Sequence, residues 1–155
     1  MTTMTTPELR TIGEQTVAII PIRTTPGGIP EAVGTAYGEL EAALRTAGVE
    51  MTGPPFSRYL DFGSKMITFE AGFPVARLFP ETGRVMMSTL PAGPVATVVH
   101  VGPYERLETT HAALAEWVEA QDREPAGPMW EVYLTDPGIE PDPERWRTEV
   151  VIPIR

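Results

Sequence analysis

The strongest constraint on the fold is an internal repeat in the sequence. Residues 53–60 (GPPFSRYL) align with residues 127–134 (GPMWEVYL) at a shift of 74 positions (127 − 53 = 74). Two further matches keep the same order at similar shifts: 17–20 with 95–98, and 70–75 with 149–154. Loop insertions between equivalent elements produce such small differences in shift. The sequence therefore predicts one domain over residues 1–155 that contains two structural copies, at about residues 14–76 and about residues 92–155.

Each copy carries the hydrophobic pattern of a β-α-β-β unit. In the first copy, residues 17–22 favour a strand, and apolar residues then recur at spacings of three and four over residues 29–47. Pro30 suits the first turn of this helix and Gly48 suits its end. The second copy repeats the order, with a strand at 95–101 followed by a helix. The remaining strands are predicted near 56–61, 65–74, 85–90, 130–135 and 147–154. The predicted fold class is α+β.

Composition excludes several classes of function. Twelve Lys and Arg residues stand against 21 Asp and Glu residues, a formal net charge of −9, and such a surface repels a phosphate backbone. We therefore expect no direct nucleic-acid partner. The chain has no cysteine, which excludes disulfides and thiolate chemistry. It shows no leader-like N-terminus and no run of about 18 apolar residues, so we expect a cytoplasmic protein without a membrane partner.

The strand at 130–134 is the most informative segment for function. Because side chains alternate along a strand, Trp130 shares one face with Val132 and Leu134, and Glu131 shares the other with Tyr133. The first face is wholly apolar, so we expect it to lie under the helices with Trp130 in the core. The other face carries a carboxylate, which is costly to bury without a partner.

Comparison of the two copies isolates this carboxylate. Ser57 and Tyr59 occupy the places of Glu131 and Tyr133, so both copies present a tyrosine and only the second adds a charge. If the copies pack about a pseudo-twofold axis, the two tyrosines would form the walls of a central cleft with Glu131 as its anion. Such a cleft suits a flat, lipophilic, often cationic molecule.

The carboxylates leave two points open. Glu131 either faces the cleft or forms a salt bridge with a nearby arginine, such as Arg58 or Arg77. Glu149 and Glu70 occupy matching places in the last strand of each copy, and each is either a surface residue or a second pocket carboxylate.

The two histidines, His100 and His111, are predicted to be structural. His111 lies on the apolar stripe of the second helix, which indicates a core histidine, and His100 ends a strand. The sequence contains no serine-hydrolase, phosphate-binding or dinucleotide-binding motif, and it predicts no metal and no cofactor. One carboxylate with phenols remains, which suffices for general-base activation of water against a strained electrophile.

Four segments in order resemble the GyrI-like small-molecule-binding family, which includes effector-binding domains of multidrug-responsive transcription activators. They are LPAG at 90–93, HVGPY at 100–104, WEVYLTDP at 130–137 and TEVVIPI at 148–154, and the resemblance extends over about residues 14–155. It implies a pair of pseudo-twofold-related β-α-β-β modules, of the SHS2 type, with a ligand cleft between them. It also implies that Glu131 meets cationic drugs, with Glu149 as a second acidic position. From alternation we add Tyr133 and Tyr59 as ligand-binding residues, and Tyr104 as a residue of the cleft rim.

The resemblance leaves three functions open. No residues remain for a helix-turn-helix segment, so the expectation is a stand-alone domain without a DNA-binding domain. The first candidate is a multidrug-binding protein for aromatic cations. The second is a hydrolase that opens cyclopropane rings of DNA-alkylating natural products in detoxification, with Glu131 and Tyr133 as catalytic residues. The third is a protein that interacts with DNA gyrase.

Overall fold

Helix α1 begins and ends where the sequence predicted. In the computed structural model, which describes residues 3–155, α1 spans Ile29–Ala47 and has Pro30 in its first turn. It ends at Gly48, whose backbone adopts a left-handed conformation (φ 67°, ψ 32°) and whose N–H donates to the carbonyl of Arg45. Only glycine adopts this conformation without a steric cost from Cβ, so the chain can reverse here.

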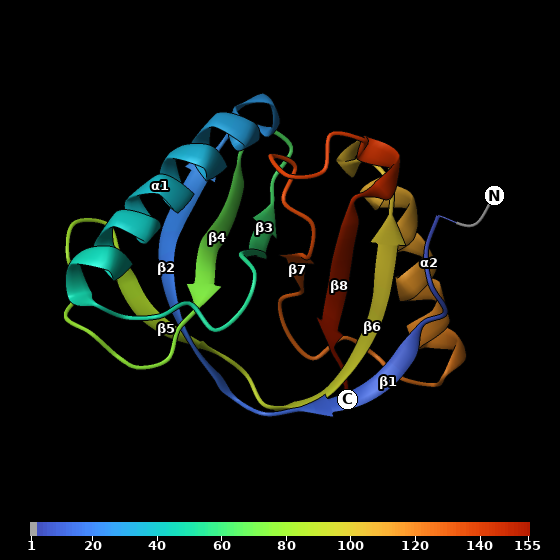
Figure 1. Cartoon of the computed structure of the whole chain (residues 1–155). Helices are drawn as coiled ribbons and strands as arrows, with labels where there is room; N and C mark the ends of the chain where they lie inside the picture. The colour runs from blue at the N-terminus through green and yellow to red at the C-terminus, as the bar shows by residue number, and fades with distance from the viewer. Residues whose placement is uncertain (1–2) are drawn as a thin grey trace. The chain divides into compact units, whose positions relative to one another are not determined.

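Helix α1 packs on an antiparallel sheet within one compact unit, Gly13–Ala92, which we call the α1 unit. The strand order is β3-β4-β2-β5, with α1 lying over β2 and β4 (Figure 1). The strands are β2 (Gln15–Thr24), β3 (Phe56–Phe62), β4 (Ile67–Pro74) and β5 (Met86–Leu90). Gly72 lets β4 lie close to its neighbours, because a Cβ there would come within 2.8 Å of the Phe56 ring and 2.6 Å of the Ala18 carbonyl oxygen.

The second compact unit, the α2 unit, joins the N-terminal segment through Ile12 to Gly93–Arg155. Its antiparallel strand order is β1-β6-β8-β7, and helix α2 packs on β6 (Figure 1). The elements are β1 (Glu8–Ile12), β6 (Gly93–Val101), the short 3-10 helix η2 (Tyr104–Arg106), α2 (Leu107–Ala120), β7 (Trp130–Tyr133), η3 (Pro143–Arg145) and β8 (Arg147–Pro153).

Both units contain strand, helix, strand and strand in the same chain order. In each, the last strand of the set lies between the other two: β4 between β2 and β3, and β8 between β6 and β7. Each unit also gains one outer strand, β5 beside β2 and β1 beside β6. The α+β class and the added strand at 85–90 are thus confirmed. Strand β1 was not predicted, because its sequence ELRTI is almost entirely exposed and lacks apolar alternation.

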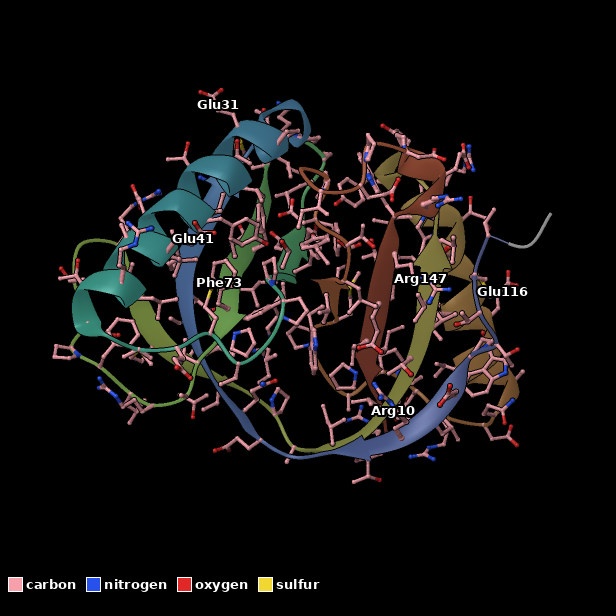
Figure 2. The ribbon with its side chains drawn as sticks, in the orientation of Figure 1. Arg10, Glu31, Glu41, Phe73, Glu116 and Arg147 are labelled. Carbon is pink, nitrogen blue, oxygen red and sulfur yellow. The ribbon has the colours of Figure 1, made fainter. Side chains whose placement is uncertain are left out.

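The core of each unit lies between its helix and its sheet. In the α1 unit, Phe73 of β4 is buried against α1, whereas Glu31 of α1 points away from the sheet (Figure 2). In the α2 unit, the core includes Leu114 and Val118 of α2, with Val98 of β6 and Val150 of β8. No helix within residues 3–155 combines the length and the apolar character that a membrane crossing requires.

Candidate ligand-binding site

Strand β7 places Glu131 and Tyr133 on the face of its sheet that α2 covers. Glu131 lies opposite Val150, a member of the core under α2, whereas Trp130 lies opposite Val151 on the other face. The expectation that the apolar face with Trp130 lies under the helix is therefore wrong, although Trp130 itself is buried. Alternation shows which residues share a face, but the identity of the face that meets a helix depends on long-range packing.

The Glu131 carboxylate is buried and is held from two sides. Its residue is 5% exposed. Oε2 lies 2.5 Å from Nε2 of His111 on α2, and Oε1 accepts a hydrogen bond of 2.9 Å from the Tyr133 hydroxyl. A buried carboxylate requires donors of this kind to offset its lost hydration.

His111 belongs to this site, so the prediction of a core histidine is wrong. The His111 side chain is 23% exposed and contacts the carboxylate, although Leu107 and Leu114 on the same helix are core residues. Because a carboxylate only accepts hydrogen bonds, Nε2 carries the hydrogen in this contact. His100, in contrast, is structural as predicted: it is fully buried, with Nδ1 2.6 Å from the Thr110 hydroxyl and Nε2 donating to the Pro103 carbonyl.

The α1 unit has an equivalent helix-to-strand contact without a charge. Tyr37 on α1 donates to the Phe56 carbonyl at 3.0 Å, and its hydroxyl lies 3.5 Å from that of Ser57. The shift of 74 that aligns Ser57 with Glu131 also aligns Tyr37 with His111. This paired change was the sequence signal that could have identified His111 as a partner of Glu131.

Aromatic rings extend the site away from the carboxylate. Tyr104 of η2 meets Tyr133 edge to face with ring centroids 5.8 Å apart, and its other neighbour is Trp146 at 4.9 Å. The Trp146 indole donates to the Glu140 carbonyl at 2.8 Å, which ties the ring to the proline-rich loop between β7 and β8. Sequence reasoning missed Trp146, since it follows that loop outside any regular pattern.

The negative charge of Glu131 affects the pKa of Tyr104. Burial raises the pKa of the Tyr104 phenol, and the negative charges of Asp136 and Glu131 raise it further. A neutral phenol is favoured near an anion because ionisation would place two negative charges close together. Glu131 thus interacts with both tyrosines, with Tyr133 through a hydrogen bond and with Tyr104 through its charge.

Glu149 and Tyr59, which the sequence prediction also placed in the site, each have neighbours within their own unit. Glu149 lies beside Val132 on the face opposite Glu131 and forms an ion pair of 3.2 Å with Arg10. Tyr59 belongs to the α1 unit, where its ring stacks on Phe62 at 5.0 Å.

The two arginines that we considered as partners of Glu131 form contacts within the α1 unit. Arg58 lies 3.9 Å from Glu70, and Arg77 donates to the Ala47 carbonyl at 3.1 Å. Burial raises the pKa of Glu70, and the Arg58 charge partly opposes this shift. Across residues 3–155, no three His, Asp or Glu side chains are arranged to hold a metal ion.

A mixed helix and strand architecture with a sequestered carboxylate beside aromatic rings is typical of a small-molecule-binding domain. The chain belongs to the family of the GyrI-like small molecule binding domain, whose model matches residues 5–155. Among curated protein sequences, none matches this chain.

Solved structures show the same fold. The C-terminal domain of EcmrR has a TM-score of 0.87 at 22% identity and covers 97% of both chains. EcmrR in a DNA complex has a TM-score of 0.88 at 20% identity and covers 99% of this chain, which spans 58% of the EcmrR chain. SAV2435 bound to tetraphenylphosphonium has a TM-score of 0.70 at 11% identity, covering 97% of this chain and 94% of that one. A hydrolase from Listeria innocua has a TM-score of 0.68 at 17% identity, covering 96% of this chain and 91% of that one.

Proposed function

We propose that this domain holds lipophilic, aromatic and often cationic compounds at Glu131, as a multidrug-binding protein does. The observation that carries the proposal is the buried Glu131 carboxylate, oriented by His111 and Tyr133. A carboxylate in a poorly hydrated site attracts a cation more strongly than one in water, because the local dielectric constant is lower.

The aromatic rings next to the carboxylate fit the same class of ligand. Tyr133, which donates to Glu131, contacts the Tyr104 ring edge to face, and Tyr104 in turn contacts Trp146, so three rings form a continuous aromatic cluster that begins at the carboxylate. Ring faces attract cations and stack on flat apolar groups. SAV2435, which shares the fold, binds tetraphenylphosphonium, a cation made of four phenyl rings.

The test is a calorimetric titration with tetraphenylphosphonium of the wild-type chain and of Glu131→Gln. Binding by the wild type that weakens in the variant supports the proposal. Equal affinity in both proteins would place the ligand away from Glu131, and an absence of binding by the wild type would exclude aromatic cations of this kind.

A second candidate is the hydrolytic opening of a cyclopropane ring, which the contact between His111 and Glu131 favours. Glu131 would accept a proton from water while the water oxygen bonds to a ring carbon. The ring C–C bond breaks, its electron pair moves into a conjugated carbonyl of the substrate, and solvent protonates the resulting enolate. His111 would hold the carboxylate in place, and Tyr133 would orient it from the other oxygen. A Listeria innocua hydrolase shares the fold.

Product analysis separates the two candidates. Incubation with a large excess of a cyclopropane-bearing alkylating compound yields many equivalents of ring-opened product if the chain is a hydrolase. A stoichiometric complex without excess product would leave binding as the function.

A further inference from the structure

The site contains a histidine that contacts the Glu131 carboxylate, and this observation deepens the proposed function on which the inference rests. Helix α2 supplies His111 as a partner of Glu131, with its Nε2 2.5 Å from Oε2. Histidine is the side chain that ordinarily changes charge between pH 5 and 8. The net charge of the His111–Glu131 pair therefore depends on whether the imidazole carries one proton or two.

The α1 unit shows that this pairing is not required to build the module. At the equivalent positions, Tyr37 and Ser57 join helix to strand through uncharged groups. Only the α2 unit places an imidazole against a carboxylate. The two units thus differ at both partners of this contact.

We infer that His111 sets the charge class of the ligand that Glu131 accepts. With neutral His111, the carboxylate keeps its full negative charge and the site binds cations. With protonated His111, the pair is neutral, and the site binds neutral aromatic compounds in preference to cations.

Apart from His111, the titratable groups of the α2 unit that contact Glu131 or act electrostatically on Tyr104 are acidic or phenolic. Strand β7 contributes Glu131 and the Tyr133 hydroxyl, η2 contributes Tyr104, and Asp136 follows β7. On α2 itself, the exposed Glu108 lies one turn before His111. Of these, Glu131 forms a hydrogen bond with the imidazole.

The coupling between proton binding and ligand binding determines whether ligand affinity rises or falls with pH. A ligand cation and the second imidazole proton compete for the same carboxylate, so cation binding releases a proton from His111. Affinity for a cation then rises with pH, by up to about tenfold per pH unit where one proton is released per ligand. Affinity for a neutral ligand of similar shape does not rise.

The experiment compares tetraphenylphosphonium with the neutral triphenylphosphine oxide between pH 5.5 and 8. Calorimetry in buffers of different ionisation enthalpy counts the protons released on binding. The key variant is His111→Gln, since the glutamine amide can still donate to Glu131 but does not titrate in this range. The control is Glu116→Gln, which removes a charge from the exposed side of the same helix, where Figure 2 shows it pointing outward.

The wild type and the control are expected to release protons and to bind the cation more tightly as pH rises, whereas His111→Gln binds it with nearly constant affinity. Because the chain has two histidines, side-chain nitrogen NMR can follow His111 directly and should show the ligand converting it to the neutral form. Two results would overturn this inference and leave the proposed function intact. One is cation binding that depends on Glu131 but not on pH. The other is cation binding whose pH dependence is retained in His111→Gln. Cation binding that is independent of Glu131, or absent, would overturn both.

Discussion

Tyr37 and His111 are separated by the same shift of 74 residues as Ser57 and Glu131, and each joins its helix to the strand that follows it in the chain. Tyr37 reaches the backbone of Phe56 and the hydroxyl of Ser57, while His111 reaches the carboxylate of Glu131. The helix-to-strand contact thus joins uncharged groups in one unit and a histidine with a carboxylate in the other. The asymmetry marks the α2 unit as the unit that carries the candidate chemistry.

Replacing Glu131 by glutamine is expected to remove the preference for cations. The variant should bind tetraphenylphosphonium more weakly by about 1–3 kcal/mol, the scale of a lost charge-assisted partner, with little change for triphenylphosphine oxide. Paired calorimetric titrations measure the difference. Glu116→Gln should leave both affinities at their wild-type values, and a similar loss in that control would show that net charge alone is responsible.

The Tyr133 hydroxyl is expected to stabilise the folded state through Glu131. Tyr133→Phe keeps the ring but removes the donor to Oε1, and a hydrogen bond to a charged group contributes about 1.5–3 kcal/mol. Urea unfolding near pH 7 should show this loss in the free energy of unfolding. Tyr104→Phe, which retains its ring contacts with Tyr133 and Trp146, serves as the matched control and should cost less.

The pKa of Tyr104 is expected to fall when nearby negative charge is removed. Asp136→Asn should lower it more than Glu131→Gln, because the Asp136 charge has the larger effect of the two. NMR of ring-labelled tyrosine, with the Tyr104 signal assigned from Tyr104→Phe, measures the pKa of Tyr104 in each variant. If this pKa is unchanged in both variants, burial alone raises it.

The raised Tyr104 pKa also predicts how stability changes at alkaline pH. The unfolded tyrosine ionises near pH 10, whereas the folded one retains its proton to higher pH. The contribution of Tyr104 to stability is therefore fully present below about pH 10 and is lost as the pH rises through the folded-state pKa. Urea unfolding of wild type and Tyr104→Phe across this range should show a steeper decline in the wild type.

The core under α2 is expected to be sensitive to truncation at Leu114. This side chain is fully buried, so Leu114→Ala should lower the free energy of unfolding by about 2–5 kcal/mol through lost burial and the cavity that remains. Leu78 is 66% exposed, and Leu78→Ala should change stability by less than about 0.5 kcal/mol. Equal effects of the two substitutions in urea unfolding would contradict this description of the core.

Local sequence patterns determined much of the secondary structure. The bounds of α1 follow from Pro30 and Gly48, since a proline fits the first turn and a left-handed glycine ends the helix. Strand alternation placed Glu131 and Tyr133 on one face, where the hydrogen bond between them confirms it. Strand β1 escaped prediction because an exposed edge strand needs no apolar pattern; its pairing with β6 defines it.

The sequence by itself determined the β-α-β-β order of elements and the presence of a carboxylate, Glu131, at the position where the first copy has Ser57. These features depend on propensity and spacing within short segments, which sequence records directly. Only the tertiary structure decided that the Glu131 face, and not the Trp130 face, meets helix α2, and that His111 is its partner. That choice depends on how a helix packs on strands distant in the chain, and no local pattern contains that information.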